Sequence, residues 1–190
     1  MNNKLLRYLL VFLVSFMFSL VFFYIIAPVY CDEVWVYGFS FNLSKGMIIY
    51  RDYNVLQMPL YFFIASGFIR VLGSYLISMH IFDCLLFASI ALMLYMIIEL
   101  KVFIMLPIFM FFIPSGYNLL CLFFLILIVY LLYKQYDNDY LMAFIVGLCF
   151  ITKQNVGIFL FVPMFIYSKK KMKSIICFLI PFLILSIYLI

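Results

Sequence analysis

The 190 residues are 71% hydrophobic, 22% aromatic and only 10% charged, and their mean hydropathy is +1.31. This composition excludes a water-soluble globular fold, because so few charged residues cannot give a folded chain a polar surface. The formal net charge of +5 could indicate nucleic acid as a partner, but the basic residues lie at the ends of apolar runs, so we assign no nucleic-acid role.

The long segments are apolar on every face. Strands that span a membrane alternate apolar with polar residues, whereas spanning helices need about 20 mostly apolar residues in a row. The sequence therefore predicts an all-α fold, a polytopic helical bundle that forms a single membrane domain over residues 1–190.

The first predicted span covers residues 8–29, which carry no charge and are long enough to cross a hydrocarbon core of about 30 Å. Lys4 and Arg7 precede it and predict a cytoplasmic N-terminus. The run is too long for the core of a signal peptide, so we expect a retained anchor.

The next apolar segment, residues 58–72, contains Arg70 and has two interpretations. As a span, it would put the basic run Lys169–Lys173 on the outside, against the positive-inside rule. As a helix lying in the membrane interface, it puts that run in the cytoplasm. We therefore predict an interfacial helix.

The remaining spans complete a map of about seven, with the C-terminus outside, in a protein of the plasma membrane. Pro114-Ser115-Gly116 divides the longest apolar run into two helices joined by a tight turn. The predicted spans after the first are residues 75–98, the two halves of 102–133, 140–151, 155–168 and 174–190.

This topology makes residues 30–74 one large extracytoplasmic loop, and Lys153 and Gln154 emerge on the same face. The charged residues of the loop that bear on chemistry are Asp32, Glu33, Lys45, Arg51 and Asp52. A carboxylate could take a proton from an acceptor hydroxyl, a basic residue could neutralise a lipid phosphate, and apolar helices could hold an isoprenoid chain. Transfer of a sugar from a polyprenyl phosphate needs those parts.

Three motifs in this region resemble a known family. Asp32-Glu33, residues 46–52 (GMIIYRD) and residues 58–62 (MPLYF) are similar to the first extracytoplasmic loop of GT-C glycosyltransferases. They resemble in particular the branch of the protein mannosyltransferases and the lipid A aminoarabinose transferases. Residues 152–154 (TKQ) are similar to a second short motif of bacterial members. The resemblance extends from the first predicted span through the sixth.

The resemblance implies roles for individual residues. Asp32 would be the catalytic base that activates the acceptor, and Glu33 would assist in binding or orienting that acceptor. The Tyr-Arg-Asp motif, Tyr50, Arg51 and Asp52, would shape the loop and approach the phosphosugar. Lys153, with Gln154 beside it, would contact the lipid phosphate. The family also has interfacial helices between its first two spans, which would make residues 39–44 helical although they alternate like a strand.

Family members usually have several hundred residues, whereas this sequence corresponds to their N-terminal membrane module. Three explanations stay open: a truncated or split gene product, a half that needs a partner subunit to supply the missing helices, or an inactive protein. The implied donor is a polyprenyl-phosphate-linked sugar, and the acceptor a hydroxyl or amine of a lipid, glycan or protein. No cofactor is predicted, and a requirement for a divalent metal stays open.

Each candidate residue also has a structural interpretation. Arg51 and Asp52 could form a local ion pair, and Lys153 could extend its ammonium group to the interface. Asp83 lies deep in a predicted span, where a polar contact inside the bundle is favoured over catalysis. His80 is expected to be packed or hydrogen-bonded. The alternative function is therefore a membrane subunit that binds or translocates a lipid-linked sugar without catalysis.

Overall fold

The computed structural model describes residues 3–23, 31–99, 116–136 and 138–189, with the side chains of Asn3, Cys31, Asp32 and Leu189 excepted. Within these ranges the chain forms eight α-helices and no strand, which confirms the all-α prediction. The helices are α1 (Asn3–Val21), α2 (Cys31–Ser44), α3 (Leu60–Leu72), α4 (Leu76–Ile98), α6 (Tyr117–Tyr133), α7 (Asp139–Phe150), α8 (Gln154–Tyr167) and α9 (Lys171–Leu189).

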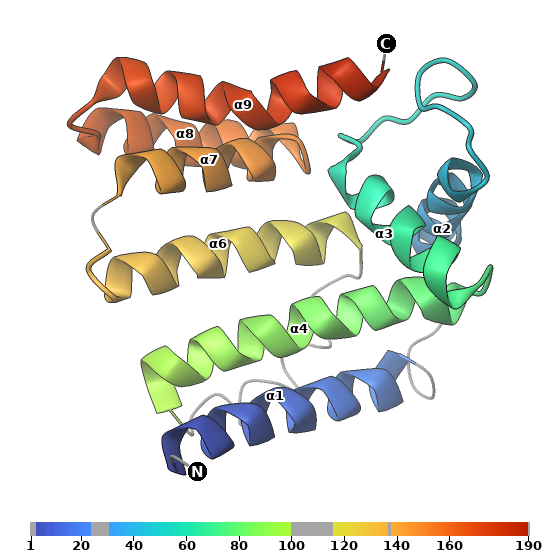
Figure 1. Cartoon of the computed structure of the whole chain (residues 1–190), viewed down its shortest axis with the longest axis horizontal. Helices are drawn as coiled ribbons and strands as arrows, with labels where there is room; N and C mark the ends of the chain where they lie inside the picture. Colours follow the sequence, from blue (N-terminus) through green and yellow to red (C-terminus); the bar gives the residue numbers. More distant parts are fainter. Residues whose placement is uncertain (1–2, 24–30, 100–115, 137, 190) are drawn as a thin grey trace.

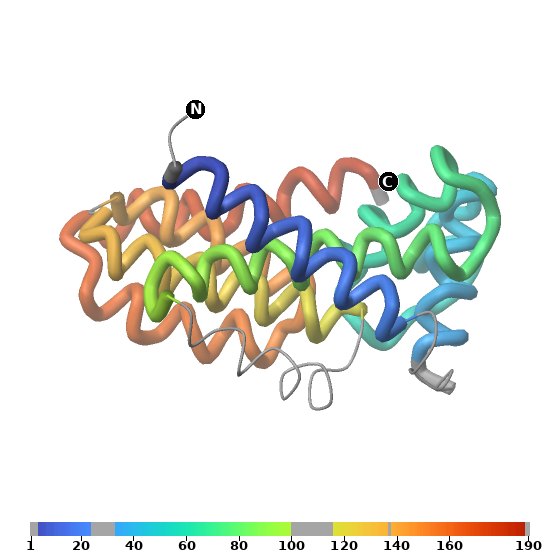
Figure 2. The backbone as a smooth tube through the Cα atoms, turned by 90° about the horizontal axis from the view of Figure 1, so that it is seen from below, coloured from blue at the N-terminus to red at the C-terminus, as the bar shows by residue number. Residues whose placement is uncertain are grey.

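Six of these helices lie roughly side by side, and α2 and α3 lie together at one end of them (Figure 1). Helix α1 packs on α4, α4 on α6, α6 on α7, and α7 on both α8 and α9. Figure 2 shows α1 running obliquely across α4, on which it packs. The main cluster of buried apolar side chains joins α2, α3, α4, α6 and α7.

Three of the described helices are long and apolar enough to cross a membrane, and they contain residues 4–21, 76–98 and 171–188. This is fewer than the seven spans predicted. Helices α6, α7 and α8 are apolar but have 17, 12 and 14 residues. At about 1.5 Å per residue, the shortest of them reaches about 18 Å, well below a hydrocarbon core of about 30 Å. The part of the sequence map that falls on residues 100–115 lies outside the described residues.

Local signals explain where several helices begin. Gly116, with φ +80°, lies directly before α6 in a conformation that favours glycine. The side chain of Asn138 accepts hydrogen bonds from the N–H groups of Tyr140 and Leu141, and so caps the start of α7. These two residues account for the starts of α6 and α7.

Helix α3 has 13 residues, too few to cross a bilayer, and it packs on α2 and α4. Its Arg70 donates from Nε to the carbonyl of Ser44 at 3.1 Å and from Nη2 to the carbonyl of Leu43 at 2.8 Å. These are carbonyls of the last turn of α2, which have no partner within the helix, so a cation there stabilises the helix end. Arg70 thus joins α2 and α3 into one unit.

The first backbone N–H of α3 is also paired outside its helix. The N–H of Leu60 donates to the carbonyl of Ile151 at 3.2 Å, and Ile151 directly follows α7. This bond brings the turn at residues 151–153 to the unit formed by α2 and α3. We call this side of the molecule, residues 31–75, 116–118 and 151–154, the α2–α3 end.

The opposite side of the molecule carries most of the basic residues. The start of α1, the end of α6 and the turn between α8 and α9 all lie there (Figure 1). We call it the basic end, and its lysines and arginine are Lys4, Arg7, Lys134, Lys169, Lys170, Lys171 and Lys173. Charge is therefore distributed unequally between the two ends of the bundle.

Candidate functional site

Glu33 lies in the first turn of α2, and its side chain is buried against α4. The carboxylate oxygen Oε1 is 2.8 Å from Nε2 of His80, and both side chains are less than 10% exposed. The distance is that of an ion pair, although the ring nitrogen is not aligned for a directed hydrogen bond. The ring of Phe23 lies 5.3 Å from the imidazole and covers it on another side. His80 is thus packed and paired, as expected from the sequence.

Asp83 follows His80 by one helical turn and is completely buried. Its Oδ1 accepts a hydrogen bond from the hydroxyl of Tyr61 at 2.9 Å and one from the N–H of Gly116 at 3.3 Å. The other carboxyl oxygen, Oδ2, has no hydrogen-bond partner among the described residues. The sequence prediction of a polar contact inside the bundle is confirmed, and the contact joins α3, α4 and the start of α6.

Arg51 and Asp52 form a local ion pair in the turn between α2 and α3. The guanidinium donates from Nε to Oδ1 of Asp52 at 2.9 Å and from Nη2 to Oδ2 at 3.0 Å, and the arginine side chain is 64% exposed. Asp52 also accepts from the N–H of Ile48 at 2.8 Å. The guanidinium, followed by this N–H, holds the pKa of Asp52 below its usual range. The structure therefore has Arg51 paired with its neighbour in the chain.

Two tyrosines hold the same turn. Tyr50 has a φ of +67°, unusual for a residue with a side chain, and the residue is 48% exposed. Tyr53 donates its hydroxyl to the carbonyl of Phe39 in α2 at 3.0 Å and stacks on the ring of Phe39 with centroids 5.6 Å apart. Burial raises the pKa of Tyr53 to about 12, so its hydroxyl stays protonated at neutral pH. The turn is anchored on α2 through Tyr53.

Lys153 lies at the α2–α3 end, directly before α8. Its ammonium group donates to Oδ1 of Asn118 at 2.8 Å and lies 5.6 Å from the ring centroid of Tyr117. Both partners are uncharged, and no carboxylate of the described residues forms an ion pair with Lys153. Because neither partner carries a negative charge, the ammonium group is not neutralised and can bind an anion. Gln154, the first residue of α8, is exposed beside it.

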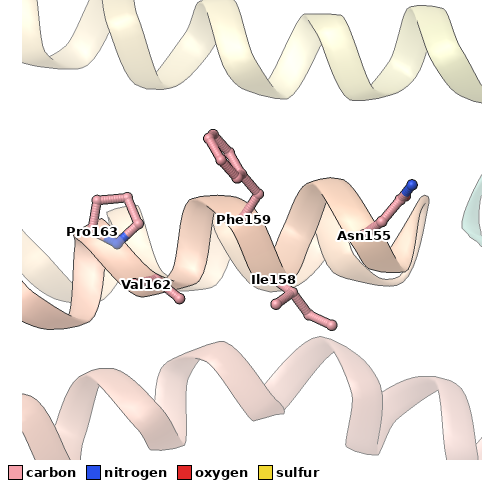
Figure 3. A pocket seen from close by; sticks show the side chains of 5 residues that line it. All are labelled: Asn155, Ile158, Phe159, Val162 and Pro163. Carbon is pink, nitrogen blue, oxygen red and sulfur yellow. The ribbon is translucent and has the colours of Figure 1, made fainter.

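An open apolar groove lies along one stripe of α8, the helix that follows the turn containing Lys153, and Lys153 is not among the residues that line it. Its volume is about 530 Å³, and one stripe of the helix lines it: Asn155, Ile158, Phe159, Val162 and Pro163. Figure 3 shows these side chains, with Asn155 at the start of the helix and Pro163 two turns further along. The polar Asn155 lies at one end of the groove and apolar side chains line the rest of it. Such a groove could bind a molecule with a polar head and an apolar chain.

The structure brings some of the predicted site residues to one end and leaves others separate. Arg51, Asp52, Lys153 and Glu33 all belong to the α2–α3 end, but Glu33 pairs with His80 and Arg51 with Asp52. The side chain of Asp32, the predicted base, lies outside the described residues. Its backbone belongs to the first turn of α2, next to Glu33.

Three partners in this region did not follow from the sequence: His80 for Glu33, Tyr61 for Asp83, and Asn118 for Lys153. The spacing of His80 and Asp83 was a usable signal, because residues three apart lie on one face of a helix. Among the described residues, no three His, Cys, Asp or Glu side chains are grouped so that they could hold a metal ion.

The fold and site define an all-helical protein with three helices able to span a membrane and a polar cluster at one end of the bundle. Comparison with protein-family models, curated proteins and solved structures finds no match.

Proposed function

We propose that this protein is a membrane glycosyltransferase that transfers a sugar from a polyprenyl-phosphate donor to a hydroxyl or amine on the extracytoplasmic face. The main support is Lys153, which forms no ion pair with a described carboxylate and lies in the turn directly before α8, the helix that carries the apolar groove. A lipid phosphate needs a cation at the membrane surface and its chain needs an apolar path beside it. The resemblance of the loop motifs to GT-C enzymes supplies the reaction.

The proposed reaction is a single displacement. Asp32 accepts the proton of the acceptor hydroxyl, and the acceptor oxygen forms a bond to the anomeric carbon from the side opposite the phosphate. The bond between that carbon and the phosphate oxygen breaks, which inverts the anomeric configuration. The leaving polyprenyl phosphate keeps the electron pair, and Lys153 stabilises the charge that it gains.

The proposal includes the seven-span topology, with the α2–α3 end outside and the basic end in the cytoplasm. The unequal distribution of lysine and arginine between the two ends supports this orientation. The short helices α6, α7 and α8 would cross with the help of the turns that flank them.

Cysteine labelling of intact cells tests the topology. We expect Lys45→Cys to react with a membrane-impermeant maleimide from outside, and Lys171→Cys to react only after the cells are opened, since both lysines are exposed but lie at opposite ends. The parent chain gives the background of its own cysteines. Labelling of both positions from the same side would contradict the map.

A binding and transfer assay tests the donor site. Replacing Lys153 by glutamine should raise the KM for a polyprenyl-phosphate sugar about tenfold to hundredfold in membrane vesicles, because a hydrogen bond to a charged group is lost. The matched control is Lys134→Gln at the basic end, where the ammonium group lies over the rings of Tyr130 and Tyr133. Equal KM values for both variants would exclude Lys153 as the phosphate ligand.

One observation favours the second candidate function, a subunit that binds the lipid-linked sugar without catalysis. Glu33, the second acid of the motif, is buried against His80 rather than exposed to an acceptor. Binding of the donor by wild-type protein, with no transfer to any acceptor supplied, would favour this function. Transfer that requires Asp32 would exclude it.

A further inference from the structure

The contact between Glu33 and His80 joins α2 to α4 at the point where α2 begins. Their side-chain atoms are 2.8 Å apart, and the two side chains are 4% and 8% exposed. Glu33 directly follows Asp32, so a contact that fixes Glu33 also fixes the backbone that carries the proposed base. The loop motifs contain no partner for Glu33, since His80 comes from a different helix.

The groups around this pair are themselves held in place. Asp83, on the same helix as His80, binds Tyr61 of α3 and the N–H of Gly116 through Oδ1. His80 and Asp83, three residues apart on one face of α4, thus belong to one buried cluster that connects α2, α3, α4 and the start of α6.

A buried ion pair contributes little net stability, because removing two charges from water costs about as much as their attraction returns. Apolar side chains of similar size would hold α2 on α4 equally well. What this polar pair adds is a defined orientation, since a Glu33 side chain placed away from the imidazole would be buried without a partner.

We infer that His80 is a positioning residue: through Glu33 it fixes the first turn of α2, and with it the base Asp32, against α4. The inference deepens the proposed function and rests on it for the role of Asp32. It also changes the role of Glu33, from a group that orients the acceptor to one that orients its neighbour. His80 itself touches neither donor nor acceptor.

Hydrogen exchange measures the positioning without any reference to activity. In lipid nanodiscs, we expect amides in the first half of α2 to exchange at least about tenfold faster in Glu33→Gln and in His80→Gln than in the parent, because each change leaves a buried group without its charged partner. The double variant should exchange no faster than either single variant, since two amides can pair with each other.

Ser89→Ala is the matched control, because Ser89 lies on α4 and its hydroxyl bonds only to the carbonyl of Leu85 in the same helix. It should leave exchange in α2 unchanged. If one single variant does not fold, the other tests the same contact, and failure of both singles with a folded double variant would support the inference. Unchanged exchange in both single variants, or effects that add in the double variant, would overturn it.

Transfer kinetics separate this inference from the proposed function. Both single variants should lower kcat about tenfold or more and leave the KM for the polyprenyl-phosphate sugar unchanged, because the donor site at Lys153 is not altered. A raised KM with unchanged kcat would contradict a positioning role. Absence of transfer in the parent would contradict the proposed function instead, and the exchange experiment would still decide whether His80 fixes α2.

Discussion

Replacing Asp32 by asparagine is expected to reduce sugar transfer about 10²- to 10⁴-fold, the contribution typical of a general base. Asparagine keeps the size of the side chain but cannot accept the proton of the acceptor. Binding of the donor should be unaffected, because the phosphate is assigned to Lys153. The measurement is transfer from a labelled polyprenyl-phosphate sugar in membrane vesicles that contain equal amounts of each variant.

The control for this experiment is Glu99→Gln. Glu99 is an exposed carboxylate directly after α4, far from the α2–α3 end, and its neutralisation should leave transfer unchanged. Equal transfer by the parent and by Asp32→Asn would remove Asp32 as the base. Loss of donor binding together with transfer would show that the substitution acts on the fold of the loop.

The second large effect is expected at Gly147, in the middle of α7. A Cβ atom added there would lie 2.3 Å from the carbonyl oxygen of Phe178, on α9. That oxygen is backbone and cannot move without moving its helix. Gly147→Ala should therefore push α7 and α9 apart and lower the stability of the bundle by about 1–3 kcal/mol. Small residues that allow two helices to approach closely are typical of membrane bundles.

Two other glycines provide the controls. At Gly38 in α2 and Gly67 in α3, an added Cβ would meet no atom within 4 Å. Alanine at these positions should leave the thermal midpoint in detergent unchanged or raise it, because glycine disfavours a helix by roughly 0.5–1 kcal/mol relative to alanine. If Gly147→Ala and Gly67→Ala gave equal midpoints, close packing of α7 on α9 would not be a source of stability.

The positions of several helices could be predicted from the sequence, because hydropathy and turn-forming residues determine helices through interactions between neighbouring residues. Residues 76–98 are apolar on all faces, and the predicted span at 75–98 differs from α4 by one residue. Gly116, the last residue of the predicted turn, lies directly before α6. Three of the described helices are long and apolar enough to span a membrane, whereas α6, α7 and α8 have 12 to 17 residues, and hydropathy alone did not predict where those helices end.

Residues 39–44 show where local pattern was not sufficient. Their alternation of Phe, Ser and Leu fits a strand, but in the structure they form the second half of α2. Helix formation there is favoured by contacts that no local pattern contains, such as the stacking of Phe39 on Tyr53 and the hydrogen bonds from Arg70 to the last carbonyls of the helix. Tertiary packing overrides a weak alternation.

The sequence indicated candidate residues but not their partners. Scarcity of charge singled out Asp32 and Glu33, and the predicted topology put Lys153 on their face; in the structure Glu33 and Lys153 both belong to the α2–α3 end. Their partners, His80 and Asn118, come from other helices and have no sequence signal that connects them. Pairing of distant side chains depends on how helices pack, and hydropathy does not encode that.

The hydrogen bond from Leu60 to Ile151 has a consequence for the order in which this protein assembles. Residue 60 leaves the ribosome long before residue 151. At a rate of synthesis of about 5–20 residues per second, the first N–H of α3 has no partner for several seconds. The bonds from Gly116 to Asp83 and from Lys153 to Asn118 also wait for later segments. The α2–α3 end is therefore completed only after the turn that follows α7 has been synthesised, and a chain interrupted before that turn would leave α2 and α3 without these contacts.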